Sequence, residues 1–457
     1  MLKVLEKLFK LKENKTNAKR EIAAGITTFM TMAYILAVNP SILSDAGMDS
    51  TAVLLATCIA SFIGTACMAF MANLPFALSA GMGLNAFFTY TVVNGLGYSW
   101  QVALLAVFIE GVIFLVLSLT KIREAIFNSI PITLKKAVSV GIGLYIAFIG
   151  LQNAGLAVNS ESTLVTAVSF TDDFNTSGIC ALLTVIGVLL TAILYIKNVK
   201  GSILIGIIGT WVLGMLCQLI GLYVPNPESG YNSVFPTFAM TDFSKLGETF
   251  GQCFNVDLSS VGIFNFIVVI FSFLFVDLFD TLGTLIGTSA KAGMLDENGK
   301  LPKIRPALLA DSIATSAGAV LGTSTTTTFV ESAAGVASGG RTGLTSLTTA
   351  VLILLSMLFA PIFIAIPSFA TAPALIIVGF LMFSAVTEIK LTGESFASAI
   401  PAYLCILTMP LFYSVSEGIS FGIISYVVLN LVCGKRKEVH PVMYVLALLF
   451  ILKYIFL

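Results

Sequence analysis

The chain of 457 residues contains few charged side chains. Asp, Glu, Lys and Arg make up 11% of it, whereas a soluble globular domain has about a quarter of such residues. Hydrophobic residues make up 57%, and the mean hydropathy is +0.99. This composition excludes an ordinary soluble protein and predicts a membrane protein that crosses the bilayer many times. The 24 basic and 24 acidic residues cancel, so a nucleic-acid partner is not indicated.

Histidine is almost absent, and cysteine is sparse. The only histidine, His440, follows the basic run 435–437 beyond the last long apolar stretch, which excludes a histidine metal site or catalytic pair within the membrane. The seven cysteines have no CxxC spacing and mostly lie in apolar runs, so they are expected to be small buried hydrophobic residues. We therefore expect no metal and no organic cofactor.

Apolar runs of about 20 residues, the length that crosses a bilayer, predict an all-α fold of fourteen transmembrane segments. The third and tenth segments are short and interrupted. The predicted segments are 22–42, 52–71, 76–94, 100–120, 134–152, 178–196, 201–223, 262–289, 304–322, 323–340, 343–366, 371–389, 396–412 and 416–433. The apolar tail 441–457 is shorter and contains Lys453, which favours a helix at the membrane interface over a fifteenth crossing.

The basic residues predict the orientation of the chain. With fourteen segments, all lysines and arginines except Lys245 and Lys453 fall on one side, including Lys121, Arg123 and Lys300. The long loops 153–177 and 224–261 on the other side contain acids instead. Because basic loops remain in the cytoplasm, we expect both termini there, in a plasma or inner cell membrane. Residues 1–21 are expected to form a basic amphipathic segment on the cytoplasmic surface.

The two halves of the chain show internal similarity. Seven segments precede the loop 224–261 and seven follow it, and residues 54–60 resemble residues 308–314. At a similar offset, Asn85 corresponds to Glu331. An odd number of segments inverts the second copy, and transporters built from inverted repeats bind their substrate near the bilayer midplane, between interrupted helices.

The two interrupted segments do not favour continuous helices. Gly81 and Gly83 precede Asn85 in the third segment, and the β-branched run 325–328 precedes Glu331 in the tenth. Each sequence predicts an extended stretch followed by a half-helix, which is tolerated at this depth only where it lines a cavity or is covered by protein. The free amides at the half-helix ends would then face a polar ligand.

Three acids lie in otherwise apolar sequence, where an ionisable group is costly unless it faces a cavity, a partner or a ligand. Asp277 and Asp280 are three residues apart on one face of the eighth segment, and Glu331 lies in the tenth. Carboxylates suit a planar ligand rich in N–H donors. Because burial favours the protonated form of a carboxyl group, all three are also candidates for proton coupling.

Other polar residues at membrane depth are weaker candidates. The residues expected to support the three acids are Tyr34, Thr281 and Asp311. Glu110 is expected to contact a neighbouring helix or a second subunit, with a place in a proton pathway as the alternative. Asn39 and Pro40 are expected to mark a kink or a helix end.

The motifs around these residues resemble the nucleobase–cation symporter-2 group, and within it the AzgA-like purine permeases. The motifs are 81–88, 277–284 and 325–335 followed by 339–343. The resemblance runs almost from end to end of the chain. It implies uptake of hypoxanthine, guanine or adenine with protons, by an elevator-type alternating-access motion, and a homodimer formed through gate domains.

The resemblance also implies roles for parts of the chain. The implied divisions are a core domain (22–133 and 262–366), a gate domain (134–223 and 367–433), an extracytoplasmic loop (224–261) and a cytoplasmic or interfacial tail (434–457). The implied substrate-binding residues are Asn85, Asp277, Asp280, Phe329, Val330 and Glu331. Phe329 and Val330 fall in a stretch whose backbone contacts substrate. Relatives specific for uracil or xanthine have glutamate and histidine where this chain has Asp280 and Thr281.

Other functions remain open beside the purine permease. A uracil or xanthine permease of the same fold is one, and an anion transporter of the related sulfate-transporter fold is another. An anion site favours a basic residue, whereas this chain has three acids and no basic residue at that depth. An intramembrane aspartyl enzyme is disfavoured because its aspartates usually come from two helices. The sequence does not decide among the purines, or between a proton and sodium as the coupling ion.

Overall fold

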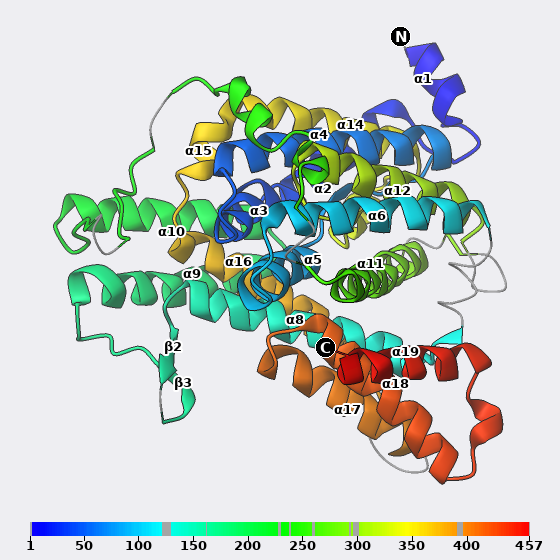
Figure 1. Ribbon diagram of the computed structural model, residues 1–457. Coiled ribbons are helices and arrows are strands. Elements are labelled where there is room, and N and C mark those ends of the chain that lie inside the picture. The colour runs from blue at the N-terminus through cyan, green and yellow to red at the C-terminus, as the bar shows by residue number, and fades with distance from the viewer. Residues whose placement is uncertain are drawn as a thin grey trace.

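The computed structural model describes residues 2–120, 129–160, 162–226, 230–236, 239–257, 261–291, 294–295, 301–390 and 396–456. Lys121, Arg123 and Lys300, which belong to the basic pattern, lie outside these ranges. The described fold is mainly helical, and many long helices run side by side across the molecule (Figure 1). Within these ranges, ten helices are long and apolar enough to cross a membrane. The protein is therefore a multi-pass membrane protein, while the count of fourteen crossings stays a prediction.

The first half of the chain begins with α1 and continues with long apolar helices. Polar side chains define where several helices begin: Asn17 accepts a hydrogen bond from the backbone of Arg20, and Asp49 accepts one from Ala52. The helices of this half are α1 (Leu2–Phe9), α2 (Ala18–Met32), α3 (Ile35–Ser44), α4 (Ser50–Cys67), η1 (Met68–Ala72), α5 (Met82–Ala86), η2 (Phe87–Gly95), α6 (Trp100–Leu119), α8 (Ile132–Asn153), η3 (Phe174–Gly178), α9 (Ile179–Ile196) and α10 (Ser202–Leu219).

The second half follows a loop that contains two short helices, η5 (Phe243–Glu248) and η6 (Gln252–Phe254). Ser414 begins α18 by accepting a hydrogen bond from the backbone of Glu417. The later helices are α11 (Ile263–Lys291), α12 (Ile304–Leu321), α13 (Ser332–Ala337), α14 (Gly343–Ser356), η7 (Met357–Phe359), α15 (Ala360–Ile364), α16 (Ser368–Phe383), η8 (Ser384–Glu388), α17 (Phe396–Leu411), α18 (Val415–Val432), η10 (Arg436–Glu438) and α19 (Pro441–Phe456).

Two antiparallel strand pairs interrupt the helices. β1 (Leu78–Ala80) pairs with β4 (Thr326–Thr328), with Ser79 opposite Thr327. These strands lie in the third and tenth predicted segments, so the prediction of extended stretches there is confirmed. β2 (Ala157–Ser160) and β3 (Leu164–Ala167) form a hairpin that the all-α prediction missed. Most of its side chains are not buried, so no alternation of apolar and polar residues indicated it.

The first predicted segment breaks at a different place from the one expected. The break between α2 and α3 lies at Ala33 and Tyr34, and Pro40 lies inside α3. The hydroxyl of Thr31 donates to the carbonyls of Thr27 and Thr28, and such bonds to the preceding turn bend helices. The expectation of a helix end at Asn39 and Pro40 is therefore wrong, while the alternative, a kink at Pro40 within α3, stays a prediction.

Helices from the two halves of the chain pack in matching pairs. α6 packs against α12 and α14 packs against α4, while α16 packs on α9 and α17 packs on α8. α8 and α16 also pack against each other. In Figure 1, α8, α9, α17 and α18 lie in the lower part of the molecule, and α2, α4, α12 and α14 lie in the upper part. Each half thus contributes helices to both parts.

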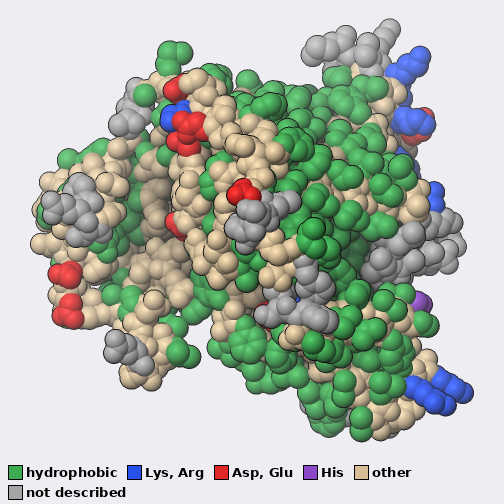
Figure 2. All heavy atoms as spheres, viewed as in Figure 1, with side chains coloured by type: hydrophobic (Ala, Val, Ile, Leu, Met, Phe, Trp, Pro, Cys, Tyr) green, Lys and Arg blue, Asp and Glu red, His purple; other side chains and the backbone are tan. Residues whose placement is uncertain are grey.

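Charged side chains gather at the ends of the helix bundle. Figure 2 shows Lys and Arg mainly along the right-hand edge, where Figure 1 places α1, and acids toward the left. Hydrophobic side chains cover much of the surface between them. This distribution matches helices that cross a bilayer from left to right in the view.

The C-terminal helix α19 packs against α18. Its side chains Met443 and Phe450 are fully buried, and the side chain of Lys453 is only 12% exposed. These contacts show how α19 packs on the protein and do not place it relative to the bilayer. Its expected location at the membrane interface stays a prediction.

Candidate functional site

The β1–β4 pair forms the frame of the candidate site. Beyond the strands, the amide of Gly81 donates to the carbonyl of Thr325 at 3.0 Å, and the amide of Phe329 donates to the carbonyl of Ala77 at 2.9 Å. Asn85 follows β1 on α5, and Glu331 follows β4 at the start of α13. Because the strands are antiparallel, the chain leads to these two residues from opposite ends of the pair.

Glu331 lies partly exposed at the start of α13. The hydroxyl of Tyr34 donates to its Oε1 at 2.6 Å, and Tyr34 is fully buried at the break between α2 and α3. The ring of Tyr34 lies 6.5 Å from that of Phe329. Tyr34 therefore holds the carboxyl group in place, and a carboxylate that accepts one hydrogen bond retains the capacity to accept others from a ligand.

Asp280 is also partly exposed and contacts the strand pair. Its Oδ2 accepts a hydrogen bond from the hydroxyl of Thr327 at 3.1 Å. The backbone of Gly81 passes so close that a Cβ atom there would lie 3.2 Å from the same oxygen. A larger residue at position 81 would press on this acid, which explains the glycine.

Asp277 occupies a different environment although it is three residues away. It is fully buried, and the hydroxyl of Thr281 lies 2.8 Å from its Oδ1 and 2.9 Å from Oδ1 of Asp311. One hydroxyl hydrogen cannot be donated to both carboxyl groups. Asp277, Thr281 and Asp311 form what we term the buried acid cluster, between α11 and α12. The structure thus separates it from the partly exposed acids Asp280 and Glu331.

Asn85 is fully buried on α5. The hydroxyl of Ser324 donates to its Oδ1, and its Nδ2 has no hydrogen-bond partner within the described part of the chain. A buried polar group without a partner costs about 1–3 kcal/mol. A ligand that presents a hydrogen-bond acceptor to Nδ2 would remove this cost.

Phe329 and Val330 differ in what they offer a ligand. The amide of Phe329 is already bonded to Ala77, and its side chain is 5% exposed, so it contributes packing against Tyr34. Val330 is 47% exposed. The expected backbone contact to a ligand is therefore available at Val330, whereas the amide of Phe329 is used by the strand pair.

Sequence reasoning missed the role of the hydroxyl groups in residues 323–327, which it treated only as strand-forming. These groups contact several different helices. The partners are Asn39 and Thr57 for Thr323, Asn85 for Ser324, Glu110 for Thr325 and Asp280 for Thr327. Glu110, which was expected to contact a neighbouring helix or a second subunit, contacts Thr325 in the extended stretch before β4. Six consecutive hydroxyl residues, where valine would form a strand equally well, were the available signal.

The residues on one side of the two partly exposed acids are more exposed than those on the other side. Toward the C-terminal ends of α11 and α13, Gly283 and Ala337 are exposed and Ala334 is partly exposed. In the other direction, Phe87 and Phe273 are buried and pack edge to face, with ring centroids 4.8 Å apart. The described residues beside the acids are therefore more exposed on the side on which α11 and α13 end than on the other side.

A separate cavity of about 540 Å³ lies among the ends of α8 and α9, the start of α16 and the loop after α10. Its lining includes Gln152, Ser177, Tyr231 and Phe369, and none of the described residues that line it is acidic. It therefore does not match the chemistry expected for a ligand rich in N–H donors.

Known transporters resemble this chain over nearly its whole length. Residues 19–421 match the model of a permease family that covers xanthine and uracil permeases. The chain is 44% identical to the guanine/hypoxanthine permease PbuO of Bacillus subtilis, over 98% of this chain and 99% of that protein. It is 39% identical to the adenine permease AdeP of Escherichia coli, over 99% of this chain and 96% of that protein.

Solved structures share the fold at low sequence identity. The transmembrane domain of the cyanobacterial bicarbonate transporter BicA superposes with a TM-score of 0.59 at 14% identity, over 87% of this chain and 96% of that one. SLC26A9 superposes with a TM-score of 0.58 at 12% identity, over 91% of this chain and 65% of that one. The sequence relatives are permeases and not enzymes. The chain therefore belongs to the xanthine/uracil permease family, the nucleobase–cation symporter-2 group.

Proposed function

We propose that this protein imports purine nucleobases across a cell membrane, with hypoxanthine, guanine and adenine as the candidate substrates. The observation that carries the proposal is the set of polar groups beside the β1–β4 pair: two partly exposed acids, Asp280 and Glu331, and the amide nitrogen of Asn85, which has no partner among the described residues. Asn85 lies one helical turn after Gly81, whose backbone lies against Asp280. A purine presents ring N–H donors to carboxylates and an oxo group or ring nitrogen to the amide. The names of the relatives, guanine/hypoxanthine permease and adenine permease, agree with this chemistry.

The site does not suit an anion, even though one neighbour in fold transports bicarbonate. Two carboxylates at the site would repel an anion. In the described part of the chain, Lys136 pairs with Glu388 and Lys245 with Asp49. The guanidinium of Arg341 donates to the carbonyls of Val336 and Gly340. At 14% sequence identity, the similarity to BicA concerns the fold alone. The substrate is therefore inferred from the side chains of the site.

The proposed coupling ion is a proton held by the buried acid cluster. Asp277 and Asp311 share one hydroxyl, that of Thr281, and two negative charges this close disfavour each other. One proton relieves this repulsion. Asp277 and Thr281 of this cluster lie on the same helix as Asp280, so occupation of Asp280 by a substrate can be transmitted to the cluster through α11.

The proposed architecture is a seven-plus-seven inverted repeat of fourteen segments, with a core domain that moves against a gate domain. The matching helix pairs and the antiparallel pairing of β1 with β4 support the repeat. The division into core (22–133, 262–366) and gate (134–223, 367–433) follows the same packing. With the basic end in the cytoplasm, the N-terminus and the basic loop 435–437 lie there, and the two acids are approached from the same side. From this loop α19 runs back beside α18, toward Glu417. A homodimer through the gate domains remains an expectation from the family.

A nucleobase panel tests the proposal. Purified protein is titrated with hypoxanthine, guanine, adenine, xanthine, uracil and bicarbonate, with the thermal shift as the readout. Proteoliposomes then measure uptake with and without an imposed proton gradient. We expect stabilisation by at least one of the three candidate purines, and uptake that collapses when a protonophore dissipates the gradient. Stabilisation by bicarbonate alone would contradict the substrate, and uptake driven only by sodium would contradict the proton.

A further inference from the structure

The C-terminal helix α19 forms a hairpin with α18, joined by residues 433–440. Its buried residues Met443, Leu446, Ala447 and Phe450 recur at the spacing of one helical face. The opposite face is also apolar, with Val445, Leu448 and Ile455 exposed. A helix with one apolar face on the protein and another left exposed fits a position among lipid tails beside the bundle.

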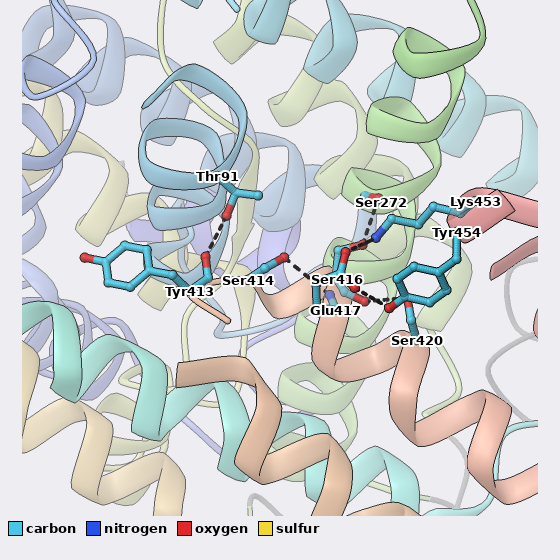
Figure 3. A network of polar contacts seen from close by, with 9 residues as sticks. All are labelled: Thr91, Ser272, Tyr413, Ser414, Ser416, Glu417, Ser420, Lys453 and Tyr454. Carbon is cyan, nitrogen blue, oxygen red and sulfur yellow. Dashed lines mark hydrogen bonds and ion pairs between the residues drawn. The ribbon is translucent and has the colours of Figure 1, made fainter. Parts of the chain in front are cut away.

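Polar contacts bind α19 to α18, as Figure 3 shows. Lys453 forms an ion pair with Glu417, to which the hydroxyl of Tyr454 also donates. The side chains of Lys453 and Glu417 are only 12% and 24% exposed. In a membrane, separating such a pair leaves two uncompensated charges, so this contact is expected to persist.

The contacts of α19 and α18 with α11 are of a different kind. The ring of Phe450 packs against the rings of Phe271 and Phe275, with centroids 5.4 and 5.6 Å away. Ser416 of α18 donates a hydrogen bond to Ser272 of α11 at 2.9 Å (Figure 3). Lipid tails are as apolar as these rings, so parting the aromatic contact in a bilayer costs far less than breaking the ion pair.

We infer that α18 and α19 form one unit that docks on α11 in this conformation and leaves it during transport. This inference rests on the proposed alternating-access function. Phe275 precedes Asp277 by two residues and Asp280 by five on the same helix, so the docked Phe450 fixes α11 close to both acids. Phe450 is thus a positioning residue that acts through α11, and Lys453 holds α19 on α18.

Two engineered cross-links test this unit. In a variant whose seven native cysteines are replaced, Phe275→Cys with Phe450→Cys joins α11 to α19. The matched control, Phe421→Cys with Tyr454→Cys, joins α18 to α19, where the two rings lie 6.1 Å apart. A short, cleavable bis-thiol reagent forms each link. Hypoxanthine uptake into proteoliposomes is measured before linking, after linking and after cleavage.

Linking α11 to α19 should lower uptake by about tenfold or more, with recovery after cleavage, because a locked interface cannot complete the transport cycle. The link between α18 and α19 should leave uptake within about twofold of its unlinked value. Equal uptake with both links, whether high or low, overturns the inference. Failure of the proposed function is distinct, because the unlinked protein would then neither bind nor transport a purine.

A single substitution in the native-cysteine protein gives an independent readout. Phe450→Ala removes the docking ring and leaves the ion pair of Lys453 intact. We expect the hypoxanthine Kd to stay within about twofold and the maximal uptake rate to change by about threefold or more, because docking affects the motion and not the contacts of the ligand. An unchanged rate at unchanged Kd overturns the inference, as does a lower melting temperature that accounts for the whole change in rate.

Discussion

The two broken segments occupy corresponding places in the halves of the chain but supply different chemistry. The first, with β1 and α5, contributes glycine backbone and the neutral amide of Asn85. The second, with β4 and α13, contributes a row of hydroxyl groups and the acid Glu331. The strands pair directly with each other, so both kinds of chemistry meet in one place.

This difference suggests a division of roles within the site. The first segment allows close approach: a Cβ atom on Gly81 would lie 3.2 Å from Asp280, and one on Gly83 would lie 2.9 Å from Ile142 of α8. The second segment positions charge, because Thr327 holds Asp280 and the segment itself carries Glu331. Binding should therefore depend more on the acids around the second segment than on the amide of the first.

The largest expected effect comes from Glu331→Gln, which removes the charge of the second segment and keeps its shape. Hydrogen bonds to a charged group are worth about 1.5–3 kcal/mol each, and the substitution weakens both the bond to the ligand and the one from Tyr34, so we expect purine binding to weaken by about a hundredfold or more. Equilibrium binding of hypoxanthine measures this, with Tyr34→Phe as a milder control. Wild-type affinity for every purine would remove Glu331 from the site.

Asp280→Asn should have the next largest effect. The asparagine keeps a partner for Thr327 but loses the negative charge, so we expect binding to weaken by about tenfold to a hundredfold. The melting temperature should change little, because Asp280 is only partly buried. Competition binding with labelled hypoxanthine measures the loss. Asp280→Glu is the control, because it keeps the negative charge of the side chain but changes the side-chain length.

Asn85→Ala should have a smaller effect, which sharpens the contrast between the two segments. It removes one neutral hydrogen bond to the ligand, worth about 0.5–1.5 kcal/mol, so binding should weaken by about two- to tenfold. Folding should be retained, because Nδ2 has no partner to lose among the described residues. If this variant lost more affinity than Glu331→Gln, the proposed division of roles would be reversed.

Thr325→Val should affect binding least. The hydroxyl of Thr325 donates to Glu110 of α6 at 2.9 Å, whereas that of Thr327 donates to Asp280. Its loss should lower the free energy of unfolding by about 1–3 kcal/mol, because a buried acid loses a donor. Hypoxanthine affinity should stay within about twofold. Thermal melting and binding are measured on the same sample, and a loss of affinity without a loss of stability would place Glu110 within the site.

The sequence was sufficient to predict the membrane class and the interrupted segments, while the role of the three acids stays a prediction. Each of these depends on rules that act locally, such as the cost of a charge in an apolar run. The glycines before Asn85 and the β-branched run before Glu331 indicated the extended stretches, and the structure pairs them as β1 and β4.

The remaining features depend on contacts between distant residues. Asp277 and Asp280 have similar sequence surroundings, yet one faces Asp311 and the other faces Thr327, and only the packing of α11 separates them. The break at Tyr34 follows from threonine hydroxyls that bond to the backbone, while the nearby Pro40 was the more obvious signal. The attachment of α19 to α18 depends on Glu417, which lies 36 residues before Lys453.

The most direct test of the central claim is a structure of the protein with bound hypoxanthine. The base should lie between the two broken segments, within hydrogen-bond distance of Glu331, Asp280 and the amide of Asn85. A base bound in the separate cavity beside Gln152 and Tyr231, or one that contacts a single broken segment, would contradict the account.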